Sequence, residues 1–200
     1  YGDYCVNDVE LTNALFAQFM RTKNFKTTEL KVIDLTLRMF IEPVLTLNKE
    51  KLQNHLTSIR GDKEELIGRT TISKDDLMSN PKFAKALEGL GVKAPTKISL
   101  RTGKETFALA KNDEGFIELQ NHEDQRVRDL VTARLGLKST LEETRTERFL
   151  DIASRGAFPV PIKYYAAHTG RWGGSDKINL QNLPSRGENA KVLKSCIEAP

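Results

Sequence analysis

The residues best suited to chemistry lie in one polar, glycine-rich stretch, residues 168–187. It reads HTGRWGGSDKINLQNLPSRG and combines two arginines with several amide side chains. Arginine presents a rigid fork of donors to phosphates, and Asn and Gln each offer a donor and an acceptor. Glycines let the backbone approach a ligand closely. Such side chains can test base-pair shape through minor-groove acceptors, so the pattern favours a nucleic-acid interface over a simple polar loop.

The net charge of +4 comes entirely from the end of the sequence. Residues 155–200 carry seven basic and three acidic side chains, whereas the residues before them are balanced. A local basic excess suits a phosphate-rich partner, although it is also typical of a solvated face.

Several absences narrow the class of protein. The two cysteines, Cys5 and Cys196, form no metal-binding pair, and the three histidines are isolated, so neither a disulfide framework nor a zinc site is expected. No apolar run is long enough to span a membrane, and no signal peptide is recognisable. We therefore expect a cytoplasmic protein that is not secreted and has no membrane partner.

The elements that must position the polar stretch begin with helices. Apolar residues recur at helical spacing throughout residues 1–42. Asn48 is a plausible cap for the next helix, which Gly61-Asp62 is expected to break or bend. Asn80 is expected to cap a further helix that has Pro81 at its first helical position and Gly91 at its left-handed stop.

The middle of the sequence contains a basic loop and a long helical region. Residues 94–112 are expected to form an irregular loop with a turn at Thr102-Gly103. Residues 124–155 read as one helix or as two in succession. On a continuous helix the following four cations would share one arc: Arg134, Lys138, Arg145 and Arg148. They would either lie along the edge of a core or form a phosphate-facing ridge.

Near the end, Pro159 and Pro161 exclude a helix, and residues 162–167 are expected to form a strand. The segment TGRWGGSDKINLQNLPSRG that follows closely resembles the T-G-R-(x)n-N-L-Q-N-(I/L)-P-x-R motif of family-A DNA polymerases. The resemblance is closest to phage or viral members, which share the YYAAHTGRW lead-in at residues 164–172.

The resemblance implies a role for each polar side chain of this motif. Arg171 would contact the minor groove at the primer terminus, and Arg186 would reach the phosphates of the incoming nucleotide. The remaining residues would bind or support the DNA near the active site: Thr169, Asn179, Gln181 and Asn182.

Two earlier regions resemble the same family. Residues 4–8, YCVND, are similar to its Tyr-x-x-x-Asp exonuclease motif. In that family Asp8 would be a metal ligand and Tyr4 would orient the attacking water, with Mg²⁺ as the cofactor of the complete enzyme. From the residues alone, Asp8 could equally cap the first helix. Residues 77–140 resemble the thumb, which makes three lysines candidates for DNA-backbone contacts: Lys82, Lys111 and Lys138.

The resemblance implies a mainly α fold with a short α/β portion at the C-terminal end, as part of a multidomain polymerase. Residues 1–42 would end a 3′–5′ exonuclease domain, 43–155 would form a helical thumb, and 156–200 would begin the palm. We expect an internal segment of a DNA-directed DNA polymerase that is inactive by itself, because most catalytic carboxylates of the family fall outside it. Its expected partners are primer–template DNA and dNTPs. A processivity factor is a further candidate partner of the thumb. A phage-encoded enzyme would act in the bacterial host cell.

Two alternatives belong to other classes of protein. One is a stand-alone, non-catalytic helical module that binds duplex DNA. The other is a structural helical protein, which the polar motif disfavours. Salt-dependent DNA binding separates the structural protein from the other two.

Overall fold

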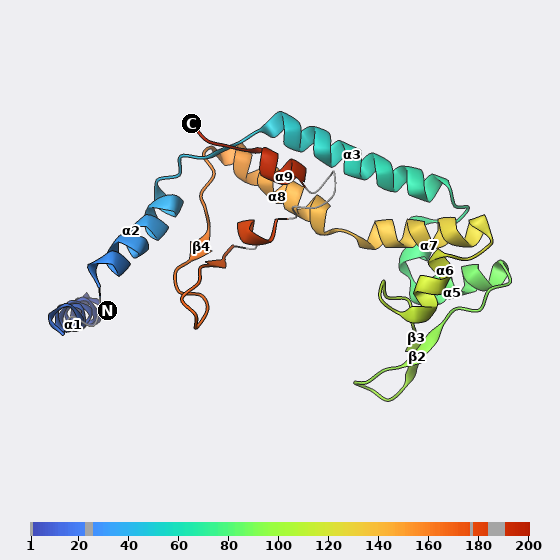
Figure 1. Ribbon diagram of the computed structural model, residues 1–200, viewed down its shortest axis with the longest axis horizontal. Helices are drawn as coiled ribbons and strands as arrows, with labels where there is room; N and C mark the ends of the chain where they lie inside the picture. Colours follow the sequence, from blue (N-terminus) through green and yellow to red (C-terminus); the bar gives the residue numbers. More distant parts are fainter. Residues whose placement is uncertain (1, 23–25, 177, 184–190) are drawn as a thin grey trace. The chain divides into compact units, whose positions relative to one another are not determined.

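The computed structural model describes residues 2–22, 26–176, 178–183 and 191–200 (Figure 1). It is mainly helical, with a few short strands in two-stranded sheets, which confirms the expected fold class at this level. The chain divides into two compact units. The first unit combines Tyr1–Leu47 with Arg155–Pro200, and the second is Asn48–Ser154. The names exonuclease, thumb and palm stay predictions for these parts of the chain.

Over its described residues, the first unit contains helices and two short strand pairings. In chain order its elements are α1 (Gly2–Arg21), α2 (Thr27–Ile41), β1 (Thr46–Leu47), β4 (Ile162–Lys163), β5 (Gly173–Gly174), the 3₁₀ helix η1 (Leu180–Asn182), α9 (Val192–Ser195) and β6 (Ile197–Glu198). β1 pairs antiparallel with β6, and β4 pairs antiparallel with β5. An isolated bridge joins Leu45 to the fully buried Phe158. The β1–β6 pairing and the Leu45–Phe158 bridge bring the two separate stretches of the unit together.

The second unit is built from helices and one β-hairpin. Its elements are α3 (Lys49–Gly68), α4 (Lys74–Met78), α5 (Asn80–Gly89), β2 (Thr96–Ile98), β3 (Glu105–Phe107), α6 (Glu114–Gln120), α7 (Gln125–Lys138) and α8 (Leu141–Arg155). The largest hydrophobic cluster draws on α4, α5, α6 and α7. Phe83 and Phe116 meet inside it, with their ring centroids 6.3 Å apart. This cluster is the core of the unit.

The ends of the helices test the local sequence signals. The side chain of Asn48 accepts a hydrogen bond of 2.9 Å from the backbone N–H of Lys51, which confirms it as the cap of α3. Gly91 has a φ of +80°, which confirms the left-handed stop after α5. The expected break at Gly61-Asp62 is wrong, because α3 continues to Gly68. One interior glycine costs about 1 kcal/mol, which the buried face of α3 can offset.

The prediction that Asn80 caps α5 is wrong. Ser79 occupies the N-cap position, and Asn80 is the first residue of the helix. The side-chain oxygen of Asn80 accepts a hydrogen bond from Arg134 on α7 instead. Pro81 is the second residue of the helix, one position later than predicted. Arg134, which is distant in sequence, therefore uses the Asn80 side-chain oxygen that was predicted to cap the helix.

Three other expectations are resolved by the structure. Residues 124–155 form two helices that are separated at Ser139 and Thr140, so the basic arc does not continue across the break. The expected loop at 94–112 contains the β2–β3 hairpin. The expected strand at 162–167 has only two residues, because the chain turns at Tyr165, which has a φ of +50°.

Candidate nucleic-acid interface

The glycine-rich segment is tied to α2 within the first unit. The indole Nε1 of Trp172 donates a 3.1 Å hydrogen bond to Thr36 Oγ1, and Thr36 in turn donates to the Val32 carbonyl over 2.7 Å. The hydroxyl of Tyr164 donates to the carboxylate of Glu29 on the same helix. This hydrogen bond, followed by desolvation and the charge of Glu29, raises the pKa of Tyr164 above its ordinary value. Two aromatic side chains thereby hold the segment against α2.

The turn between β4 and β5 carries two of the predicted DNA-binding residues. Arg171 Nε donates a 3.1 Å hydrogen bond to Thr169 Oγ1. The Arg171 carbonyl accepts from the backbone N–H of Ala166 at 3.0 Å. Arg171 is exposed, and within the described part of the chain its two terminal nitrogens make no hydrogen bond. The turn thus orients the guanidinium while leaving its planar fork open to an external acceptor.

A close backbone approach follows the turn at Gly174. A Cβ at this position would lie 2.7 Å from the Asn179 side chain and 2.8 Å from its Cα. Because real Cβ contacts are essentially never shorter than 3.0 Å, any other residue here must move the backbone. The glycine therefore allows the chain to fold back from β5 to η1.

The amide residues of the motif surround η1. Asn179 caps it, because its side-chain oxygen accepts a 3.1 Å hydrogen bond from the backbone N–H of Gln181. The backbone N–H of Asn182 donates to the Asn179 carbonyl, also over 3.1 Å. Gln181 and Asn182 are exposed. Asn179 thus stabilises the start of η1, whereas the side chains of Gln181 and Asn182 lie at the surface.

A pocket of about 730 Å³ brings part of the motif together. Its lining residues are Glu29, Val32, Tyr164, Ala167, Gly170, Arg171, Trp172 and Gln181. Arg171 and Gln181, which are both predicted to bind DNA, therefore share one pocket, and aromatic rings lie beside them. Sequence reasoning missed Glu29, because no local pattern indicates that a helix residue far along the chain meets Tyr164. The predicted nucleotide-binding residue Arg186 lies outside the described residues.

The predicted exonuclease residues lie on α1. Tyr4 and Asp8 are both exposed and are four residues apart, so they share one face of the helix. Asp8 lies well inside α1, so the alternative that it caps this helix is wrong. In the described part of the chain, no group of three or more His, Cys, Asp or Glu side chains could hold a metal ion. The role of Asp8 as a metal ligand therefore stays a prediction.

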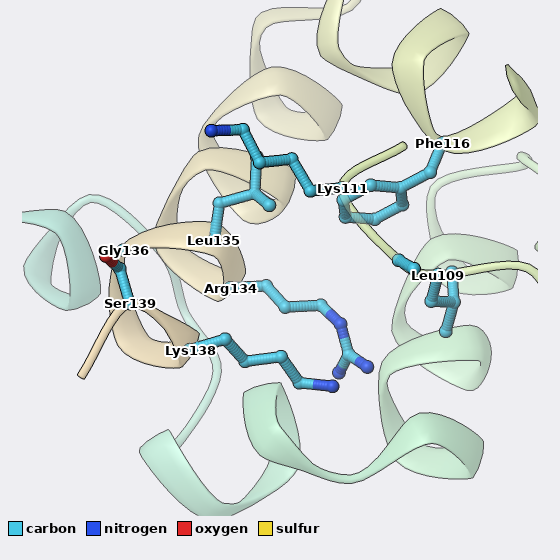
Figure 2. A pocket seen from close by; sticks show the side chains of 9 residues that line it. Leu109, Lys111, Phe116, Arg134, Leu135, Gly136, Lys138 and Ser139 are labelled. Atoms are coloured by element: carbon cyan, nitrogen blue, oxygen red, sulfur yellow. The ribbon is translucent and has the colours of Figure 1, made fainter. Parts of the chain in front are cut away.

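The three predicted backbone-contacting lysines lie in the second unit. Lys82 forms an ion pair with Asp76 at 2.6 Å, and the hydrogen bond from this lysine lowers the pKa of Asp76. Lys111, from the loop before α6, and Lys138, from α7, both line a second pocket together with Arg134 (Figure 2). The structure therefore brings two of the three lysines to one pocket and pairs the third with an acid.

The comparisons with known families and curated proteins identify no relative of this chain. No protein-family model matches the chain, and no match is found among curated proteins. None of the helices, over the residues that are described, has the length and apolar character that crossing a membrane requires.

Proposed function

We propose that this chain holds primer–template DNA as part of a DNA-directed DNA polymerase of family A. The resemblance of residues 168–187 to the family motif supports the proposal, as does the basic excess of residues 155–200. The observation that carries it is the shared pocket of Arg171 and Gln181 beside Trp172. Arg171 would donate to minor-groove acceptors at the primer terminus, steadied by Thr169, and Gln181 would contact the neighbouring base pair.

The remaining predicted residues take secondary roles in this proposal. Asn182 would support the DNA beside η1, and Arg186 would contact the triphosphate of a dNTP. Lys82, Lys111 and Lys138 would contact DNA phosphates, and Tyr4 and Asp8 would belong to a proofreading site. Two-metal phosphoryl transfer needs clustered carboxylates, which the described residues do not form, so we assign binding and positioning to this chain and no chemical step.

Fluorescence anisotropy with a labelled primer–template duplex tests the proposal. The affinity should fall linearly with salt on logarithmic axes, because phosphate contacts release counterions. Arg171→Ala should weaken binding by about tenfold, the value of one charge-assisted contact. Arg38→Ala is the matched control, because Arg38 is exposed in the same unit but pairs with Asp34 and Glu42. Salt-independent binding, or an equal loss in both variants, would contradict the proposal.

A non-catalytic module that binds duplex DNA is the second candidate, because the basic excess of residues 155–200 would serve duplex binding equally well. The two candidates differ when the sequence is expressed within its complete reading frame. For a polymerase, Arg171→Ala should reduce primer extension more than it reduces DNA binding. A protein that binds the duplex but never extends a primer in the presence of Mg²⁺ and dNTPs would be the binding module.

A further inference from the structure

A pocket of about 580 Å³ in the second unit has an unusual charge distribution. It lies between α7 and the loop before α6, and its lining residues are Leu109, Ala110, Lys111, Phe116, Arg134, Leu135, Gly136, Lys138 and Ser139 (Figure 2). Three of these residues are cationic and none is acidic. The other lining side chains are mostly apolar. The pocket therefore offers positive charge beside a hydrophobic wall.

Arg134 is a buried cation that pairs with no carboxylate of the described residues. Its side chain is fully buried, lies with Cζ 4.5 Å from the Phe83 ring centroid, and donates to the Leu77 carbonyl and to Asn80. Among the described residues, its Nε has no hydrogen-bond partner and no acid pairs with the guanidinium. Burying a charge without a counter-ion is costly. An external anion would remove that cost.

Lys138 adds a second positive charge to the same side of the pocket. Figure 2 shows the side chains of Lys138 and Arg134 extending next to each other from α7. Burial lowers the pKa of Lys138, and the charge of Arg134 lowers it further. The exposed Lys138 therefore extends beside the buried Arg134, and a bound anion would stabilise both positive charges.

We propose that this pocket binds the 5′-phosphate of a nucleotide, with the phosphate between Arg134 and Lys138. A phosphate monoester carries about −1.5 to −2 charges at neutral pH, so it balances these two cations better than a carboxylate does. The apolar lining of Leu109, Phe116 and Leu135 would lie beside the base, as is usual in small-molecule sites. The volume lies within the usual range for small-molecule sites, about 300–1,000 Å³.

This site is separate from the glycine-rich segment, although two of its lining residues, Lys111 and Lys138, are also candidates for contacts to DNA phosphates. Its lining residues all belong to the unit Asn48–Ser154, whereas Arg171 and Gln181 belong to the other unit. A substitution at Lys138 therefore tests the pocket without changing the glycine-rich segment.

Isothermal calorimetry on the full chain with phenyl phosphate tests the proposal, because this probe combines a phosphate monoester with an aromatic ring. Inorganic phosphate and phenol represent its two halves, and each should bind at least about tenfold more weakly. Lys138→Gln should weaken phenyl phosphate binding by about tenfold through the loss of one charge-assisted contact. Lys93→Gln, which removes an exposed charge outside the pocket lining, should leave the affinity unchanged.

Arg134→Met should abolish binding, and circular dichroism shows whether this variant folds. Because Arg134 also supports the core, the Lys138 variant carries the test if the methionine variant unfolds. Absence of phenyl phosphate binding at about 1 mM would overturn the proposal. An unchanged affinity in Lys138→Gln, or an equal loss in Lys93→Gln, would also overturn it.

Competition distinguishes the two sources of a nucleotide 5′-phosphate. Displacement of phenyl phosphate by dAMP, but not by a 5′-phosphorylated single strand, indicates a site for free nucleotides. Displacement by the 5′-phosphorylated strand, and not by the same strand with a 5′-hydroxyl, indicates a site for a DNA end. If neither dAMP nor the phosphorylated strand displaces phenyl phosphate, the proposal is wrong.

Discussion

Trp172 and Thr36 are joined by a hydrogen bond of 3.1 Å from the indole Nε1 to the threonine Oγ1, across 136 positions of sequence. Thr36 is buried on α2, and Trp172 lies beside the predicted DNA-contacting Arg171. Thr36 Oγ1 also donates to the Val32 carbonyl, so a single hydroxyl serves the helix and the indole. The position of the glycine-rich segment therefore depends on α2.

Thr36→Val should destabilise the first unit by about 1 kcal/mol, because it removes the acceptor of the Trp172 indole while keeping the shape of the side chain. Trp172 is the sole tryptophan, so its fluorescence during urea unfolding reports this unit directly. Thr12→Val is the matched control, because the Thr12 hydroxyl donates to the Asp8 carbonyl on the exposed helix α1. Equal effects of the two substitutions would show that the indole hydrogen bond contributes nothing.

Gly174→Ala should destabilise the first unit by about 1–3 kcal/mol, the usual range for an overpacked site. The added Cβ would meet the backbone of Asn179, which cannot rotate away. Gly61→Ala in α3 provides the contrast, because its Cβ would meet nothing within 4 Å. It should stabilise the helix by about 0.5–1 kcal/mol. Thermal unfolding followed by circular dichroism measures both, and a neutral Gly174→Ala would refute the close approach.

The ion pairs of Glu143 should make the second unit sensitive to acid. Lys63 Nζ lies 2.5 Å from Glu143 Oε2, and Arg60 Nε lies 3.0 Å from Oε1. The hydrogen bonds from Lys63 and then Arg60 lower the pKa of Glu143 below its ordinary 4.5. The folded state thus favours the ionised form. The resulting stability is present above the unfolded pKa and is lost as the pH falls through the folded pKa.

Glu143→Gln should therefore lower the free energy of unfolding by about 1 kcal/mol at pH 7 and change it little near pH 3, since one partner is exposed and screened. Urea unfolding at a series of pH values measures the difference. Glu64→Gln, at an exposed position of α3, is the control and should show no such pH dependence. A constant difference between Glu143→Gln and the parent protein across pH 3–7 would contradict the ion-pair explanation.

Local signals correctly predicted two helix ends at which the interacting groups are close in sequence. The cap at Asn48 and the left-handed Gly91 each depend on a few neighbouring residues, and both are confirmed. The cap assigned to Asn80 is wrong because a donor 54 positions away, on Arg134, takes its side chain. The strand at 162–167 is short because the chain turns at Tyr165 to form the β4–β5 hairpin.

The sequence by itself determined the helical character of the chain and singled out residues 168–187 by residue type, because periodicity, caps and polar motifs are local properties. Only the tertiary structure decided which of these residues meet. It placed Arg171 and Gln181 in one pocket with Glu29, and it buried Arg134 beside Lys138. Such pairings depend on how distant helices and turns pack, and no spacing within the sequence encodes that packing directly.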